Sequence, residues 1–151
     1  MPKRTTTLAA RCCRKGRLAD AIGHFRRAIA ANPRYDRVHF NLANALSAED
    51  RRNEAAAEFR RALAINPEFA EAHNNLGVLL GGQRRFDEAV HHFEQALAVN
   101  PEYADAHNNL GLALGSLGHK ADAIAHFRRA LEIRPDYADA RSNLSLVEMG
   151  R

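Results

Sequence analysis

A repeat of about 34 residues runs through this sequence and limits the folds open to it. The prolines Pro33, Pro67, Pro101 and Pro135 mark the period. Other columns keep the same spacing: Phe25, Phe59, Phe93 and Phe127; Ala21, Ala55, Ala89 and Ala123; Ala28, Ala62, Ala96 and Ala130; Leu8, Leu42, Leu76, Leu110 and Leu144. A repeat of this length is one supersecondary unit that buries its apolar face only against its neighbours. The chain is therefore expected to be a stack of similar units.

Within each unit the apolar spacing is helical. Ala89, Phe93 and Ala96 fall at i, i+4 and i+7, on one face of a helix. Gly81-Gly82 marks a turn before that helix, and the following proline ends it, because the residue before proline avoids the α region. The predicted helices lie near residues 4–15, 18–31, 36–49, 52–65, 70–82, 86–99, 104–117, 120–133 and 138–149.

Small residues follow the leucine column directly, at Ala9, Ala43, Gly77, Gly111 and Ser145. A small side chain where two helices cross lets their axes approach to the short end of about 8–10 Å. The phenylalanine of the second helix is then expected to fill the space between the pair and the next unit. The predicted fold class is all-α, a solenoid of antiparallel helical hairpins.

This pattern of small residue, Ala, Phe, Ala and Pro resembles the tetratricopeptide repeat. The resemblance divides the chain into units 2–35, 36–69, 70–103 and 104–137, with a capping helix at 138–149, in one domain spanning 2–151. It implies a right-handed superhelix whose first helices line a concave groove. The sequence departs from the family where an aromatic residue usually opens the first helix: Thr5, His39, His73 and His107 stand there.

Asparagines form a further column on the first helix of each unit. Asn41, Asn75, Asn109 and Asn143 recur at the interval of the prolines, and Asn44, Asn74 and Asn108 lie beside them. Asparagine is a middling helix former that costs up to about 0.7 kcal/mol against Ala. Its amide both donates and accepts hydrogen bonds, so it can bond a peptide backbone without reading side chains. We predict that these seven residues bind a peptide. The alternatives are bonds between neighbouring helices, or survival from a recent duplication that left "AHNNLG" in two units.

The strings "AEAHNNLGVLL" and "ADAHNNLGLAL" are similar to the repeats of O-GlcNAc transferases, where such a ladder lines the groove. The predicted function is a protein-interaction scaffold that binds an extended partner segment in its concave groove. The alternative is a substrate-recruiting part of an O-GlcNAc transferase-like system. Relatives that clamp a terminal carboxylate use Lys and Arg on the groove helices, and only Arg14 and Arg37 could serve here. The residues argue against that clamp.

No residue pattern here predicts catalysis or a cofactor. The sequence contains no nucleophile elbow, no phosphate-cradling glycine loop and no metalloprotease motif. The histidines lack metal-ligand spacing, and equivalent positions in successive units should lie about 9–10 Å apart, too far to share one zinc ion. We therefore predict that the chain is not an enzyme and that it holds neither a metal nor a cofactor.

Charge and cysteine content narrow the partners and the location. Residues 1–37 carry ten Lys or Arg against Asp20 and Asp36, so this end has a charge of +8 and the remainder −4, within a net charge of +4. No aromatic platform accompanies the arginine pairs, which argues against nucleic acid. No run reaches membrane-spanning length. Cys12 and Cys13 are adjacent and form no disulfide framework, which favours the cytoplasm; the acid-free residues 1–19 leave a presequence as an alternative. The oligomeric state stays open, including self-assembly through the first helix.

Overall fold

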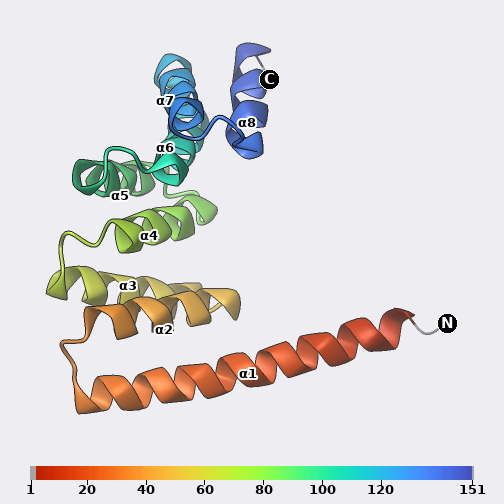
Figure 1. The fold of residues 1–151 in the computed structure, drawn as a ribbon, viewed down its shortest axis with the longest axis vertical. Helices are drawn as coiled ribbons and strands as arrows, with labels where there is room; N and C mark the ends of the chain where they lie inside the picture. Colours follow the sequence, from red (N-terminus) through yellow and green to blue (C-terminus); the bar gives the residue numbers. More distant parts are fainter. Residues whose placement is uncertain (1–2, 151) are drawn as a thin grey trace. The chain divides into compact units, whose positions relative to one another are not determined.

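The computed structural model describes the backbone of residues 3–150 and the side chains of residues 16–150, and its regular structure is α-helical throughout. The helices in these residues are α1 (Lys3–Ala31), α2 (Asp36–Ala48), α3 (Arg52–Ile65), α4 (Ala70–Gly82), α5 (Phe86–Val99), α6 (Ala104–Ser116), α7 (Lys120–Ile133) and α8 (Ala138–Glu148). Figure 1 shows them as consecutive hairpins along the chain. The predicted all-α fold of stacked hairpins is confirmed.

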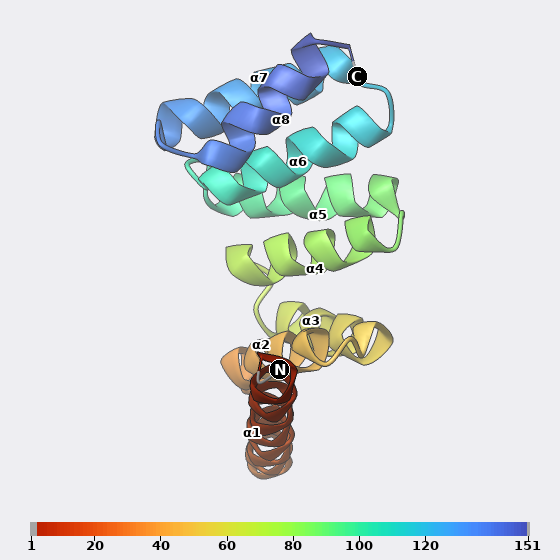
Figure 2. The same cartoon turned by 90° about the vertical axis from the view of Figure 1, so that its right-hand side faces the viewer.

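The chain divides into two compact units, Met1–Pro67 and Glu68–Arg151. In the first unit, α2 and α3 form a hairpin and α1 packs on α2. In the second, α4 pairs with α5, α6 pairs with α7, and α5 also packs on α6. The last helix, α8, lies against α7 in both views (Figures 1 and 2) and also contacts α6. The single domain over 2–151 stays a prediction.

From residue 36 onward, each predicted helix is present with its ends within one residue of the expected bounds. Each hairpin turns at the same column, where the backbone enters the left-handed region. The φ angles there are 61° at Asp50, 62° at Arg84 and 88° at Gly118. The turn is closed by a bond from the next residue to a leucine near the end of the preceding helix, such as His119 N–H to the Leu114 carbonyl at 2.9 Å.

The prediction of two helices at 4–15 and 18–31 is wrong, because α1 is one continuous helix over Lys3–Ala31. The turn column falls at Gly16, which lies inside α1, and beyond the adjacent helix backbone no atom lies within 4 Å of where its Cβ would be. The leucine that closes each later turn corresponds to Cys12 here. The preceding segment has few apolar residues beyond Leu8, so folding it back would bury too little apolar surface to offset the entropy of closing a hairpin.

The core of the second unit depends on contact between glycine and phenylalanine. A Cβ at Gly77 would lie 2.6 Å from Phe93 Cε1, and one at Gly111 would lie 2.7 Å from Phe127 Cε1. Both rings are almost completely buried. The predicted close crossing at the small-residue column is therefore confirmed, and any larger residue there would displace the ring.

Within the part of the chain that the structure describes, every helix is too short or too polar to cross a membrane.

Candidate functional site

The asparagines of the second unit form a chain of hydrogen bonds that links α4, α6 and α8. Asn143 donates from Nδ2 to Asn108 Oδ1 at 2.9 Å, and Asn109 donates in the same way to Asn74 Oδ1 at 3.0 Å. Within each helix the first asparagine donates to the second, Asn74 to Asn75 at 3.2 Å and Asn108 to Asn109 at 3.5 Å. Hydrogen bonds in a row polarise one another, so this chain fixes the orientation of each amide.

The structure separates the predicted peptide-binding asparagines into two groups by burial. Asn74 and Asn108 are only 5% and 4% exposed. The other five, Asn41, Asn44, Asn75, Asn109 and Asn143, are half-buried on the first helix of each hairpin or on α8. The alternative that asparagines bond neighbouring helices is therefore seen within the second unit. Peptide binding by the seven residues stays a prediction.

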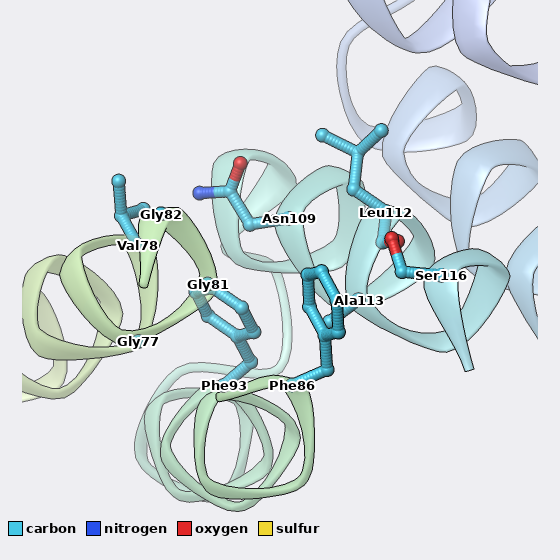
Figure 3. A pocket seen from close by; sticks show the side chains of 10 residues that line it. All are labelled: Gly77, Val78, Gly81, Gly82, Phe86, Phe93, Asn109, Leu112, Ala113 and Ser116. Carbon is cyan, nitrogen blue, oxygen red and sulfur yellow. The ribbon is translucent and has the colours of Figure 1, made fainter. Parts of the chain in front are cut away.

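Beside this chain of amides, α4, α5 and α6 enclose a pocket of about 240 Å³. Its lining is Gly77, Val78, Gly81, Gly82, Phe86, Phe93, Asn109, Leu112, Ala113 and Ser116. Figure 3 shows the two phenylalanine rings rising from α5 between α4 and α6, with the Asn109 amide at the edge. Gly77 of α4 packs directly on Phe93, whereas Gly81 and Gly82 leave space, since beyond the adjacent helix backbone a Cβ at either would make no contact closer than 3.9 Å. The result is a mostly apolar hollow with two polar side chains, Asn109 and Ser116, in its lining.

A second pocket of about 250 Å³ repeats the first one unit further along the chain. Its lining is Gly111, Leu112, Gly115, Ser116, Lys120, Phe127, Asn143, Leu146 and Val147. Each of these positions lies one repeat length after a residue of the first pocket. The two pockets share Leu112 and Ser116, so they are adjacent. They differ mainly where Lys120 replaces Phe86.

Exposed aliphatic side chains stand at the rims of these pockets. Val78, Leu112 and Leu146, again one repeat length apart, are 49%, 45% and 48% exposed. Large apolar residues that recur at one exposed position form a patch. Such patches mark interaction surfaces more often than single exposed apolar residues do. On α2 the same column holds Asn44, so the aliphatic row belongs to the second unit.

A pairing between the two helices of each hairpin was not predicted from the sequence. His39 lies 2.6 Å from the Glu58 carboxylate, whereas His73 faces His92 at 3.1 Å and His107 faces His126 at 3.0 Å between Nδ1 atoms. The partners are separated by 19 residues in each case. The sequence could have indicated this pairing only through that 19-residue spacing, which is shorter than the interval between equivalent positions of successive units. These residues join the two helices of one hairpin.

The protonation of the pair in the last hairpin follows from its bonds. His107 Nε2 lies 3.1 Å from the Pro101 carbonyl, which can only accept, so that nitrogen carries a proton. Nδ1 of the neutral ring then accepts a hydrogen bond from His126. Burial lowers the pKa of both His107 and His126, and a positive charge on His107 would lower the pKa of His126 further. The pair is thus built for its neutral form.

No cluster of three or more His, Cys, Asp or Glu that could hold a metal ion occurs among the residues with described side chains. The arginine pairs of the second helices are exposed, as expected for a solvated face. Arg128 pairs with Glu148 at 2.8 Å and Arg129 with Glu132 at 2.9 Å. Cys12, Cys13 and Arg14 lie outside the residues whose side chains are described.

This arrangement defines a helical-hairpin repeat protein with two similar pockets one repeat length apart in its second unit. Two models of the tetratricopeptide repeat match the chain, one over residues 14–79 and the other over residues 74–138. Together they cover most of the sequence. The chain belongs to the tetratricopeptide repeat family, whose members typically serve as protein–protein interaction modules.

Solved structures give the same fold. The crystal structure of MamA matches with a TM-score of 0.85 at 25% identity, covering 90% of this chain and 80% of that one. PilF of Pseudomonas aeruginosa matches with 0.83 at 25% identity, covering 95% and 66%. The first repeat domain of Spaghetti (RPAP3), bound to the HSP90 peptide SRMEEVD, matches with 0.75 at 20% identity, covering 76% and 91%. At that identity it shows the fold alone. No curated protein matches the chain.

Proposed function

We propose that this chain is a non-enzymatic interaction module that holds an extended segment of a partner protein across the two pockets of α4–α8. The observation that carries the proposal is the repetition of one apolar pocket, with one asparagine amide at its edge, at an interval of one repeat. An extended segment offers side chains and free backbone groups at regular intervals, and the face offers apolar space and amides at regular intervals.

The pockets would supply affinity through burial of apolar side chains, at about 25 cal/mol per Å² of apolar surface removed from water. Asn109 and Asn143 line the pockets, so their amides would bond the backbone of the segment. Each such bond contributes about 0.5–1.5 kcal/mol net. The buried Asn74 and Asn108 would hold those amides in position. Because ordering a flexible segment costs free energy, we expect modest affinity, about micromolar.

One solved structure of this fold holds a peptide. The repeat domain of Spaghetti (RPAP3) binds a seven-residue HSP90 peptide, SRMEEVD. For this chain we propose binding of a partner segment by the same kind of fold, without assigning that peptide to it. Of the two cationic clamp candidates, Arg37 is at the start of α2, in the other unit from the pockets.

Selection from a library of unstructured peptides tests the proposal. We expect the wild-type chain to enrich a related set of peptides, and Leu112→Gln to lose them because Leu112 lines both pockets. Val99→Gln is the matched control, since Val99 is also exposed, at 42%, but lies on α5 outside the pockets. Equal melting temperatures would exclude a folding defect. Enrichment that survives Leu112→Gln, or no enrichment by the wild type, would refute the proposal.

A second function is favoured by the asparagine column and by the strings around Asn74 and Asn108. In this alternative the chain recruits substrates to a separate glycosyltransferase of the O-GlcNAc type. Purification of the tagged chain from its own cells, followed by mass spectrometry, separates the two functions. A glycosyltransferase retained in stoichiometric amount supports the alternative, and its absence among the retained proteins contradicts it.

A further inference from the structure

The spacing of the two pockets constrains the conformation of whatever occupies them. Because they share Leu112 and Ser116, the pockets are direct neighbours along the row of α4, α6 and α8. Adjacent packed helices lie about 8–10 Å apart, and α4 contacts α6 as α6 contacts α8. One step from pocket to pocket is therefore about one helix-packing distance.

Few backbone conformations place two side chains on the same side at that distance. A β-strand advances about 3.3 Å per residue with alternating side chains, so neighbours on one face lie about 6.6 or 13 Å apart. A helical segment advances about 1.5 Å per residue with about 3.6 residues per turn, so residues on one side lie about 4.5–6 Å apart at i+3 or i+4 and about 10.5 Å apart at i+7, on either side of this distance. A polyproline II segment advances about 3.1 Å per residue with three residues per turn, so residues i and i+3 lie about 9.3 Å apart on one side.

We infer that the pockets of α4–α8 bind a polyproline II segment whose aliphatic residues, three positions apart, enter the two pockets, with an acidic residue beside the one in the second pocket. This inference rests on the proposed function and names its partner class. The cavities suit such side chains, since an apolar cavity of about 150 Å³ holds benzene. A polyproline II backbone makes no internal hydrogen bonds, so its carbonyls are free for Asn109 and Asn143.

Charge distinguishes the two pockets and orients the segment. The lining of the first pocket has no ionisable group, whereas the second has Lys120 at the position of Phe86. Lys120 is exposed at the start of α7. An acidic neighbour of the second aliphatic residue would meet its ammonium group at short range. The first nineteen residues of this chain carry no acidic residue and five Lys or Arg before Gly16, so charge disfavours the chain's own first segment as the occupant.

Synthetic peptides of fixed composition test the spacing. Binding to the full chain is measured by isothermal titration with leucines at i and i+2, i+3 or i+4, each with proline or glycine between them. We expect the i+3 peptide with prolines to bind at least tenfold tighter than the other spacings, because the proline ring fixes φ in the polyproline II range. Replacing the prolines by glycines should weaken it about fivefold or more. Equal binding at all spacings, or tighter binding of the glycine peptide, would overturn the inference.

The charge is tested with Lys120→Glu and a peptide pair that differs by one acidic or basic residue beside the second leucine. The wild type should prefer the acidic peptide by about threefold or more at low salt, and the variant should prefer the basic one. An unchanged preference contradicts the assigned orientation. If library peptides bind through Leu112 but ignore the three-residue spacing, the proposed function stands and this inference fails. If no peptide binds, both fail. Self-association of the chain detected by light scattering, and abolished by Leu112→Gln, would make a second copy the occupant and would also overturn it.

Discussion

The first repeat and the last hairpin contain the same phenylalanine column in different surroundings. Phe127 of α7 is 1% exposed and lies against Gly111 of the preceding helix. Phe25 of α1 is only half-buried, with Ala21 and Ala28 half-buried beside it, although the equivalent alanines of α7 are fully buried. The comparison shows that the repeated phenylalanine belongs to the core only where the first helix of its repeat folds back against the second. In α1 the helix continues through Gly16.

A second difference separates α2 from α4 and α6. Phe40 occupies the position of Asn74 and Asn108 and packs against Phe59 with ring centroids 5.9 Å apart. The hairpin of α2 and α3 thus uses an aromatic pair where the second unit uses amides. Since Asn44 also replaces the aliphatic rim of Val78, the pockets and the amide chain occur together. That coincidence is what we expect if both serve one binding face.

The largest predicted effect tests the comparison of Phe127 with Phe25 directly. Phe127→Ala should destabilise the chain by about 3–5 kcal/mol, because it removes a buried ring and leaves a cavity beside Gly111. Phe25→Ala should cost about 1–2 kcal/mol, since a half-exposed ring loses less transfer free energy and leaves no enclosed void. Urea unfolding of the two variants provides the measurement. Equal losses would show that α1 is packed like the later hairpins.

The amide chain should contribute a smaller amount. Asn108→Ala should cost about 1–3 kcal/mol, because it removes the acceptor of Asn143 and leaves buried polar groups without partners. A double-mutant cycle with Asn143→Ala isolates the bond between the two residues. We expect a positive coupling energy of at least about 0.5 kcal/mol. Additive effects of the two substitutions would show that the chain of amides is not a source of stability.

The paired histidines of the last hairpin predict a dependence on pH. Because the pKa values of His107 and His126 are lowered in the folded chain, the unfolded chain binds more protons at mildly acidic pH. Their contribution is complete above the ordinary pKa of about 6.5 and is lost as the pH falls from about 7 toward the lowered values. Arg129 opposes protonation of His107 and Glu132 favours it, while Asp122 favours protonation of His126.

Thermal melts between pH 8 and pH 5 measure this effect. His126→Gln should reduce the loss of melting temperature on acidification relative to wild type. The variant no longer contains the His107–His126 pair, whose protonation the folded chain resists. His91→Gln is the control, since His91 is exposed on the neighbouring hairpin. A wild-type loss equal to that of His126→Gln would contradict the assignment.

The smallest predicted effect tests the straight path of α1. Gly16→Ala should raise stability by about 0.5–1 kcal/mol, since alanine loses less backbone entropy in a helix and, beyond the adjacent helix backbone, no atom lies within 4 Å of its Cβ position. If the chain instead turned at residue 16 with the positive φ of Gly118, alanine would be strained and the substitution would lower stability. Circular dichroism melts distinguish the two signs.

These particulars show how far the sequence predicts the molecule. The repeated columns predict α2–α8 because proline, glycine and the apolar stripe act locally. They fail at α1, where Gly16 permits a turn but too little apolar surface favours it. The asparagine column identified the residues of the amide chain, yet not their bonds, because which amide faces which depends on the packing of neighbouring units. The pockets arise from glycine, phenylalanine and leucine on separate helices, a combination that no local pattern displays.

The most direct test of the binding face is a map of peptide contacts by NMR. An isotope-labelled chain is titrated with a peptide enriched from the library, and backbone and asparagine side-chain amides are followed. We expect the largest shifts at Gly81, Gly115, Asn109 and Asn143, with little change at the exposed Arg128 and Arg129 of α7. Shifts concentrated on the arginines of α7 or along α1, with the pocket residues unchanged, would contradict binding at this face.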